Sequence, residues 1–277
     1  MAKAYISCDL EGCSGVVNYQ FSNPEGKFYK EAQAYMTGDV VAAIQGLQSA
    51  GVDEIVVNDS HWNMTNIRIE DLPTGVTLIS GGIKLDSMGE GLDDSFAAAL
   101  FIGYHPKWGE PRGVIAHTYS GDVMDIQIND QSVGESGLVG GLAGYYNVPL
   151  IHVAGDTVLR EEIRTLNPNI QFTATKEGHT RLAARLYHPE DVHRAMKKDV
   201  EKAWKERKSI KPVVYSSPVE VAVKFKETPM ADICMRVPGT RRIDNLTVAY
   251  SHQDYLIAYR AVLAMLYIAN SVKTPPM

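Results

Sequence analysis

Acidic and imidazole side chains follow four apolar runs of this sequence, and one more acid begins a glycine-rich run. Carboxylate and imidazole are ligands of Zn²⁺, Mn²⁺ and Co²⁺, so the set favours such a metal over Cu(I) or an iron–sulfur cluster. One site with three or four ligands would use only part of the set, whereas five or six groups are enough for two metals about 3.5–4 Å apart with a bridging carboxylate. The candidates are Asp9, Glu11, His61, His105, His117 and Glu135.

Several neighbouring residues have alternative roles that the sequence leaves open. Asp59 and Asp156 follow strand-like runs, and each could bind a metal or cap a turn. Cys8 directly precedes Asp9, and because neighbours in a strand point to opposite faces, we expect the thiol to pack in the core. The other histidines are expected to be structural or to lie on the surface: His152, His179, His188, His193 and His252.

The elements that must position the candidates alternate between apolar strands and helical patterns. Strands are predicted at 4–8, 54–57, 76–80, 97–102, 114–116 and 149–154, and helices at 38–50 and 135–146. This alternation predicts an α/β fold with a largely parallel sheet flanked by helices. In such sheets ligands bind beyond the carboxyl ends of the strands, which is where the acids and imidazoles fall.

The later part of the chain changes character. A hairpin is predicted around 124–130, and the glycine-rich helix at 135–146 is expected to be buried. The later elements are expected at 189–207 (helix), 219–226 (strand), 230–235 (helix), 245–250 (strand) and 253–269 (helix). We therefore predict a metal-binding catalytic α/β domain at 1–200 and a smaller C-terminal α+β subdomain at 201–277, with a soft boundary at 187–212.

Composition excludes several classes of partner. The net charge of −6 disfavours nucleic acid, and the mixed run at 197–208 is typical of a solvated helix face. No apolar run reaches the roughly 18 residues that a membrane-spanning helix needs. Three sparse cysteines suit a reducing compartment, and the N-terminal run does not have the pattern of a signal peptide, so a cytoplasmic location is expected.

The ordered motifs resemble the dinuclear zinc D-aminopeptidases. Ser7 to Gly12 (SCDLEG) matches the S-x-D-x-E-G signature of that family, and the resemblance runs from Ala4 to the C-terminal helix. The later matching landmarks, in order, are 58–61 (NDSH), 90–93 (EGLD), 103–105 (GYH), 116–118 (AHT) and 133–135 (VGE).

The resemblance implies a role for each candidate. Asp9 would bridge two zinc ions, Glu11 and His61 would complete one site, and His105 and Glu135 would complete the other. By the same resemblance His117 would be the catalytic histidine. It also implies a homo-oligomer, a decamer of two stacked pentameric rings.

The expected function is that of a zinc-dependent aminopeptidase. It would release the N-terminal residue of short peptides through a hydroxide that bridges the metals, and the resemblance implies a preference for D-residues, as in D-Ala-D-Ala. One alternative is a dinuclear amidase or phosphoesterase; a phosphoester would need further donors, for which Lys84 and Arg112 are candidates. Another is a non-catalytic peptide-binding protein with a structural metal, although structural zinc sites are usually rich in cysteine.

Overall fold

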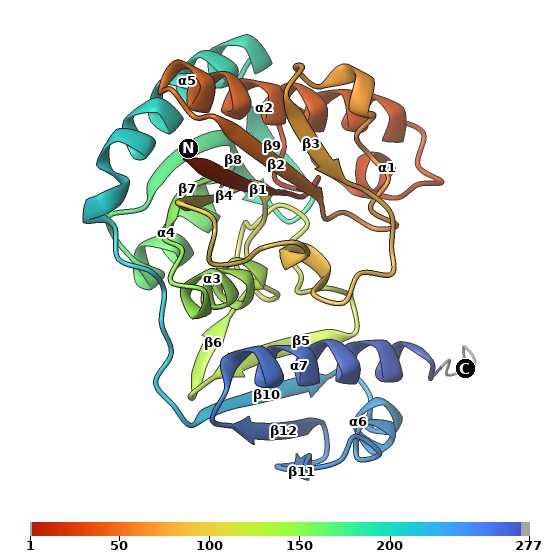
Figure 1. The fold of residues 1–277 in the computed structure, drawn as a ribbon. Coiled ribbons are helices and arrows are strands. Elements are labelled where there is room, and N and C mark those ends of the chain that lie inside the picture. Colours follow the sequence, from red (N-terminus) through yellow and green to blue (C-terminus); the bar gives the residue numbers. More distant parts are fainter. Residues whose placement is uncertain (1, 273–277) are drawn as a thin grey trace.

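A seven-stranded sheet forms the centre of the computed structural model, which describes residues 2–272 (Figure 1). Its strand order is β3-β2-β1-β4-β7-β8-β9, and every neighbouring pair is parallel except β8 with β9. The strands are β1 (Lys3–Cys8), β2 (Glu54–Asp59), β3 (Val76–Ile79), β4 (Ala98–Tyr104), β7 (Leu150–Asp156), β8 (Gln171–Thr180) and β9 (Ala183–Leu186). The predicted α/β class with a largely parallel sheet is confirmed.

Helices cover both faces of this sheet, as they must when parallel strands are joined by crossovers. Helices α2 and α5 pack on each other over one face, and α3 and α4 cover the other (Figure 1). Their bounds are α2 (Tyr29–Ser49), α3 (Glu135–Tyr145), α4 (Thr157–Leu166) and α5 (Pro189–Glu206). Short turns of helix lie in the connections: α1 (Tyr19–Ser22), η1 (Ile69–Asp71), η2 (Ser87–Gly89) and η3 (Arg207–Ser209).

The strand order reverses between β1 and β4. From β1 the chain runs outward through β2 to β3, and then returns to the other side of β1 to form β4. The loops after β1 and β4 therefore leave the sheet in different directions and open a crevice at its carboxyl edge. In open α/β sheets this switch point is the usual ligand site.

A second, antiparallel sheet of five strands has the order β11-β12-β10-β5-β6. Helix α7 packs on this sheet and also contacts α3, so it joins the two layers (Figure 1). The elements are β5 (Val123–Ile128), β6 (Gln131–Val133), β10 (Val219–Phe225), α6 (Thr228–Cys234), β11 (Arg241–Arg242), β12 (Thr247–His252) and α7 (Tyr255–Asn270). Strands from both sides of residues 187–212 build this sheet, and the division into 1–200 and 201–277 stays a prediction.

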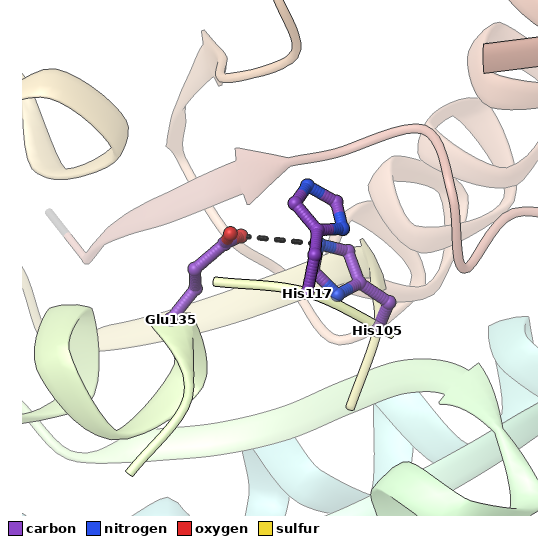
Figure 2. A group of neighbouring side chains, drawn as sticks. All are labelled: His105, His117 and Glu135. Atoms are coloured by element: carbon purple, nitrogen blue, oxygen red, sulfur yellow. Dashed lines mark ion pairs between the residues drawn. The ribbon is translucent and has the colours of Figure 1, made fainter. Parts of the chain in front are cut away.

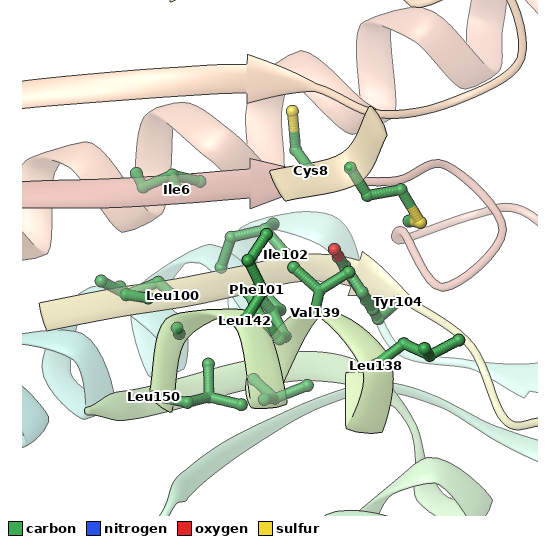
Figure 3. Close-up of a cluster of buried hydrophobic side chains, with 14 of the residues drawn as sticks. Ile6, Cys8, Leu100, Phe101, Ile102, Tyr104, Leu138, Val139, Leu142 and Leu150 are labelled. Carbon is green, nitrogen blue, oxygen red and sulfur yellow. The ribbon is translucent and has the colours of Figure 1, made fainter. Parts of the chain in front are cut away.

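Part of the hydrophobic core lies where the central strands meet α3 (Figure 3). Phe101 on β4 lies beside Leu142 on α3, and both side chains are fully buried. The glycines of α3 allow close approach of other segments; a Cβ on Gly144 would lie 1.7 Å from the carbonyl oxygen of Val213. The prediction that this glycine-rich helix is buried is confirmed.

Two predicted elements differ from those observed. Residues 114–116 form no strand; they lie in a loop where Ile115 has a positive φ of 50° and its N–H donates to the carbonyl oxygen of Arg181. The predicted helix at 38–50 is the second half of α2, which begins at Tyr29. Within residues 2–272, no helix is both long and apolar enough to cross a bilayer.

Candidate metal centre

Four elements end or begin at the carboxyl edge of the central sheet and bring most of the candidates together. Asp9 follows β1, His105 follows the adjacent strand β4, and His61 follows β2 on the other side of β1. Glu135 is the first residue of α3, and Glu11 lies in the turn that begins with Asp9. All five residues are buried, with exposed fractions of 2–5%.

The backbone after β1 is fixed against the end of β4. The N–H of Asp9 donates to the carbonyl oxygen of Ile102 at 2.8 Å, and the N–H of Gly12 donates to that of Gly103 at 2.7 Å. A Cβ on Gly12 would lie 1.8 Å from the carbonyl oxygen of Tyr104, so only glycine permits this approach. The glycine after the two acids is therefore needed to hold the acidic turn against the neighbouring strand.

Asp9 lies between two histidine–glutamate pairs. Its Oδ1 is 3.2 Å from Nδ1 of His61, which is 3.0 Å from Oε2 of Glu11. Its Oδ2 is 3.3 Å from Nε2 of His105, which is 3.3 Å from Oε2 of Glu135. The Asp9 carboxylate thus presents one oxygen to each pair.

Backbone carbonyls fix the tautomers of both histidines, because a carbonyl oxygen can only accept a hydrogen bond. His61 donates from Nε2 to the carbonyl oxygen of Ser22 at 2.8 Å, and His105 donates from Nδ1 to that of Pro106 at 3.0 Å. In the neutral rings, the other nitrogens would face carboxylates with a lone pair. Such a contact is repulsive unless a proton or a cation lies between the two groups. In metal sites, carbonyl oxygens that accept from the other ring nitrogen orient the ligating histidines in the same way.

The donor atoms fit a zinc ion. Three buried atoms of the cluster have no hydrogen-bond partner within residues 2–272: Asp9 Oδ2, Glu11 Oε2 and His105 Nε2. Ligand atoms about 2.0–2.1 Å from a tetrahedral zinc lie about 3.3 Å from one another, and the nitrogen–oxygen separations here are 3.0–3.3 Å. The atoms therefore converge at the spacing of metal ligands.

Without a metal, protons would balance these carboxylates. Burial works to lower the pKa of His61 and His105, but Glu11 and Glu135, together with Asp9, hold both values well above the ordinary range. Burial works to raise the pKa of Asp9, yet the adjacent His105 and His61 keep it well below its usual value. A metal would have to displace protons from the imidazoles, so binding should release protons and weaken in acid.

His117 lies beside the cluster on the loop between β4 and β5 (Figure 2). Its ring stacks on that of His105, and its Nδ1 donates to the carbonyl oxygen of Ile115 at 2.8 Å. In the neutral ring, Nε2 is therefore the nitrogen that can accept a proton or bind a metal. A nitrogen of His117 lies within 4.8 Å of donor atoms of both His105 and Glu135.

A cavity of about 590 Å³ opens over the cluster. Asp9, Glu11, His61, Glu135 and His117 line its floor, and one wall is formed by α7 through Leu263, Leu266, Tyr267 and Asn270. The second sheet thus helps to position this wall of the cavity, because α7 packs on it. Other lining side chains come from separate loops and include Tyr19, Trp62, Met64, Tyr119 and Arg181.

Asp59, Asp156 and Cys8, whose roles the sequence left open, make structural contacts. The Asp59 carboxylate accepts hydrogen bonds from the N–H groups of Asn66 and Ile67, and Asp156 caps α4 through the N–H groups of Val158 and Leu159. The thiol of Cys8 is buried in the core, as predicted.

Lys176 is a residue that the sequence analysis missed. It lies on β8 with its side chain fully buried. Its Nζ donates to the carbonyl oxygens of Glu11, Cys13 and Val16 at 2.6–2.7 Å, and so holds the acidic turn in place. The only sequence signal was a lysine in a run of threonines that favour a strand.

The fold and the cluster of carboxylates and imidazoles have the features of a metal-dependent hydrolase. The chain belongs to the Peptidase_M55 family, described as D-aminopeptidase, whose family model matches residues 2–264. It is thus a peptide-bond hydrolase, and the resemblance seen in the sequence is confirmed.

Two relatives from Bacillus subtilis are similar over nearly the whole chain. A curated D-aminopeptidase of strain 168 is 35% identical over 268 residues, which cover 96% of this chain and 97% of the relative. A solved structure, the Zn-dependent D-aminopeptidase DppA, described as a self-compartmentalizing protease, matches with a TM-score of 0.95 and 34% identity. That match covers 99% of this chain and all of DppA.

Proposed function

We propose that this protein is a zinc-dependent aminopeptidase that removes the N-terminal residue, preferentially a D-residue, from short peptides such as D-Ala-D-Ala. The observation that carries the proposal is the Asp9 carboxylate, whose two oxygens each face a buried histidine–glutamate pair at 3.2 and 3.3 Å. Membership of a D-aminopeptidase family and the zinc dependence of the similar DppA support it.

The proposed metal content is two zinc ions per chain, with Mn²⁺ or Co²⁺ as possible substitutes. Asp9 would contribute to both sites, Glu11 and His61 to the first, and His105 and Glu135 to the second. The unpartnered buried atoms and the fixed tautomers of the two histidines support this assignment. Bound zinc would supply a Lewis acid and lower the pKa of water toward neutrality.

His117 would act on the substrate rather than hold the metal. Its Nδ1–H is committed to the carbonyl oxygen of Ile115, which leaves Nε2 to take up a proton and return it to the leaving amine. Its ring is half-buried beside the cavity, whereas that of His105 is buried beneath it. Tyr119 supports the site differently, because its N–H donates to Oε1 of Glu135 at 2.6 Å and orients that carboxylate.

The competing functions have less support. A phosphoesterase would need several cations near the cluster, but Nζ of Lys84 donates to Asn58 Oδ1 and the Asp59 carbonyl oxygen, and Arg112 lines a different cavity. Arg181 is the single lysine or arginine among the described residues that line this cavity. A non-catalytic protein with a structural metal would not need an open cavity over a carboxylate-rich site.

The proposal includes a homo-oligomer, since DppA is described as self-compartmentalizing. The decamer of two pentameric rings rests on the family resemblance, and a peptide substrate would reach the cavity within that assembly. The cytoplasmic location stays a prediction. Sedimentation or light scattering of the purified protein tests the assembly, and a monomer would contradict it.

The activity is tested with D-Ala-D-Ala and L-Ala-L-Ala, with and without a chelator. We expect release of D-alanine that stops on chelation and returns with added Zn²⁺. If neither peptide is hydrolysed in a chelator-sensitive way, the proposed aminopeptidase function is overturned. Equal rates on both peptides would support an aminopeptidase but overturn the preference for D-residues.

A further inference from the structure

The cavity over the metal centre contains one strongly basic side chain. Arg181, in the turn between β8 and β9, is the only lysine or arginine among the described residues that line it. Asp9, Glu11 and Glu135 line the same cavity. The cavity therefore combines an acidic cluster with a separate cation.

The guanidinium of Arg181 has no acidic partner among residues 2–272. It makes a cation–π contact with Tyr19, whose ring centroid lies 5.9 Å from the guanidinium carbon. Arg185, on the same hairpin, differs because its Nη1 lies 3.2 Å from Oε2 of Glu177. Arg181 is exposed and so retains its hydrogen-bond donors for a ligand in the cavity.

The backbone fixes Arg181 relative to the candidate catalytic histidine. The carbonyl oxygen of Arg181 accepts from the N–H of Ile115 at 2.8 Å. The carbonyl oxygen of Ile115 in turn accepts from Nδ1 of His117, also at 2.8 Å. The turn that carries the cation is thus joined to the loop that carries the imidazole, which fixes the backbone of Arg181 relative to His117.

A short peptide carries a carboxylate a few bonds from the bond to be cleaved, and a guanidinium binds a carboxylate through two parallel hydrogen bonds. We propose that Arg181 binds the C-terminal carboxylate of the substrate and thereby selects short peptides with a free C-terminus. The guanidinium lies over the ring of Tyr19, a cation–π contact that leaves its N–H groups free to donate to a ligand. This inference rests on the proposed aminopeptidase function and adds a determinant of substrate length.

The test compares D-Ala-D-Ala with its C-terminal amide on wild type and on Arg181→Ala. We expect the wild type to have a kcat/KM about 10- to 100-fold higher on the free acid, the range for loss of a hydrogen bond to a charged group. Arg181→Ala should lower the value for the free acid to that for the amide, mainly through KM, and leave the amide unchanged. Arg181→Lys should recover part of the loss.

Arg185→Ala is the matched control, since it removes an arginine of the same hairpin that is paired with Glu177. It should leave kcat/KM unchanged on both the free acid and the amide. Equal wild-type kcat/KM values on the acid and the amide would overturn the inference, as would an equal loss of kcat/KM on both in Arg181→Ala. Neither result would contradict the proposed aminopeptidase function.

A binding measurement separates this inference from the catalytic proposal. Calorimetry on the His117→Ala protein, with and without Arg181→Ala, gives the Kd of the acid and the amide without depending on turnover. Tighter binding of the acid that is lost with Arg181 supports the inference even if hydrolysis fails. Equal Kd values for acid and amide overturn it even if hydrolysis succeeds.

Discussion

The imidazole rings of His105 and His117 stack with their centroids 4.1 Å apart and their planes 11° apart (Figure 2). The two histidines nevertheless have different surroundings. Nε2 of His105 faces the carboxylates of Asp9 and Glu135, whereas Nδ1 of His117 is committed to a backbone carbonyl. Adjacent rings can thus serve separately as a metal ligand and as a proton carrier.

His117→Ala should therefore lower kcat without removing zinc. Loss of a general acid or base costs about 10²–10⁴-fold in rate, and we expect the zinc content to equal that of wild type. Steady-state kinetics and metal analysis on the same sample check both values. Loss of about one zinc per chain would contradict the catalytic role and identify His117 as a ligand.

The proposed bridging role of Asp9 predicts unequal effects of carboxylate substitutions on metal content. Wild type should bind about two zinc ions per chain, and Glu11→Gln or Glu135→Gln should each leave about one. Asp9→Asn should weaken both sites, because each site faces one of its oxygens. Elemental analysis after gel filtration measures this, with the exposed Glu161→Gln as control. One zinc in wild type would refute the bridge.

Lys176→Met should both destabilise the fold and weaken zinc binding. The substitution removes a donor from three buried carbonyl oxygens, and that of Cys13 keeps the N–H of Val16 at 3.4 Å. The other two cost about 1–3 kcal/mol each, so a loss of about 2 kcal/mol or more is expected. Burial lowers the pKa of Lys176 to about 8, so the ammonium is still mostly charged at neutral pH. Urea unfolding and zinc titration measure the effects, with the exposed Lys198→Met as control.

A change in stability with full retention of zinc in Lys176→Met would show that the lysine supports only the core. A loss of zinc at a concentration of urea far below the unfolding midpoint would instead show that it positions the turn that carries Glu11.

The buried imidazole of His152 should make the folded protein less stable in acid. Burial lowers its pKa to about 3, and its Nε2 is bonded to Oγ1 of Thr173. Below about pH 6.5 the unfolded chain takes up a proton that the folded one does not, so the free energy of unfolding falls by about 1.4 kcal/mol per pH unit until about pH 3. His152→Gln should reduce that slope by one proton.

The measurement is urea unfolding of chelator-treated protein between pH 4 and 7, so that metal release does not contribute. His179→Gln, on the exposed end of β8, is the matched control and should keep the wild-type slope. An unchanged slope in His152→Gln would show that His152 takes up its proton in the folded state as well.

The order of apolar runs and helical patterns was enough to predict the α/β class, because period and length are local properties of the sequence. It also predicted correctly that Asp9, His61 and His105 follow strands, and these side chains meet because parallel strands share one carboxyl edge. The prediction of a strand at 114–116 was wrong, because a run of three apolar residues is equally compatible with a strand and with a buried loop. Ile115 takes a positive φ that a strand does not allow.

The sequence by itself determined which residue types meet at the edge of the sheet. Only the tertiary structure decided their roles, because a role depends on which atom faces which partner. The carbonyls of Ser22 and Pro106 orient the two histidines, and Asp9 turns one oxygen to each. Lys176 and Arg181 come from a hairpin far along the chain, and only the pairing of β7 with β8 brings that hairpin to the site.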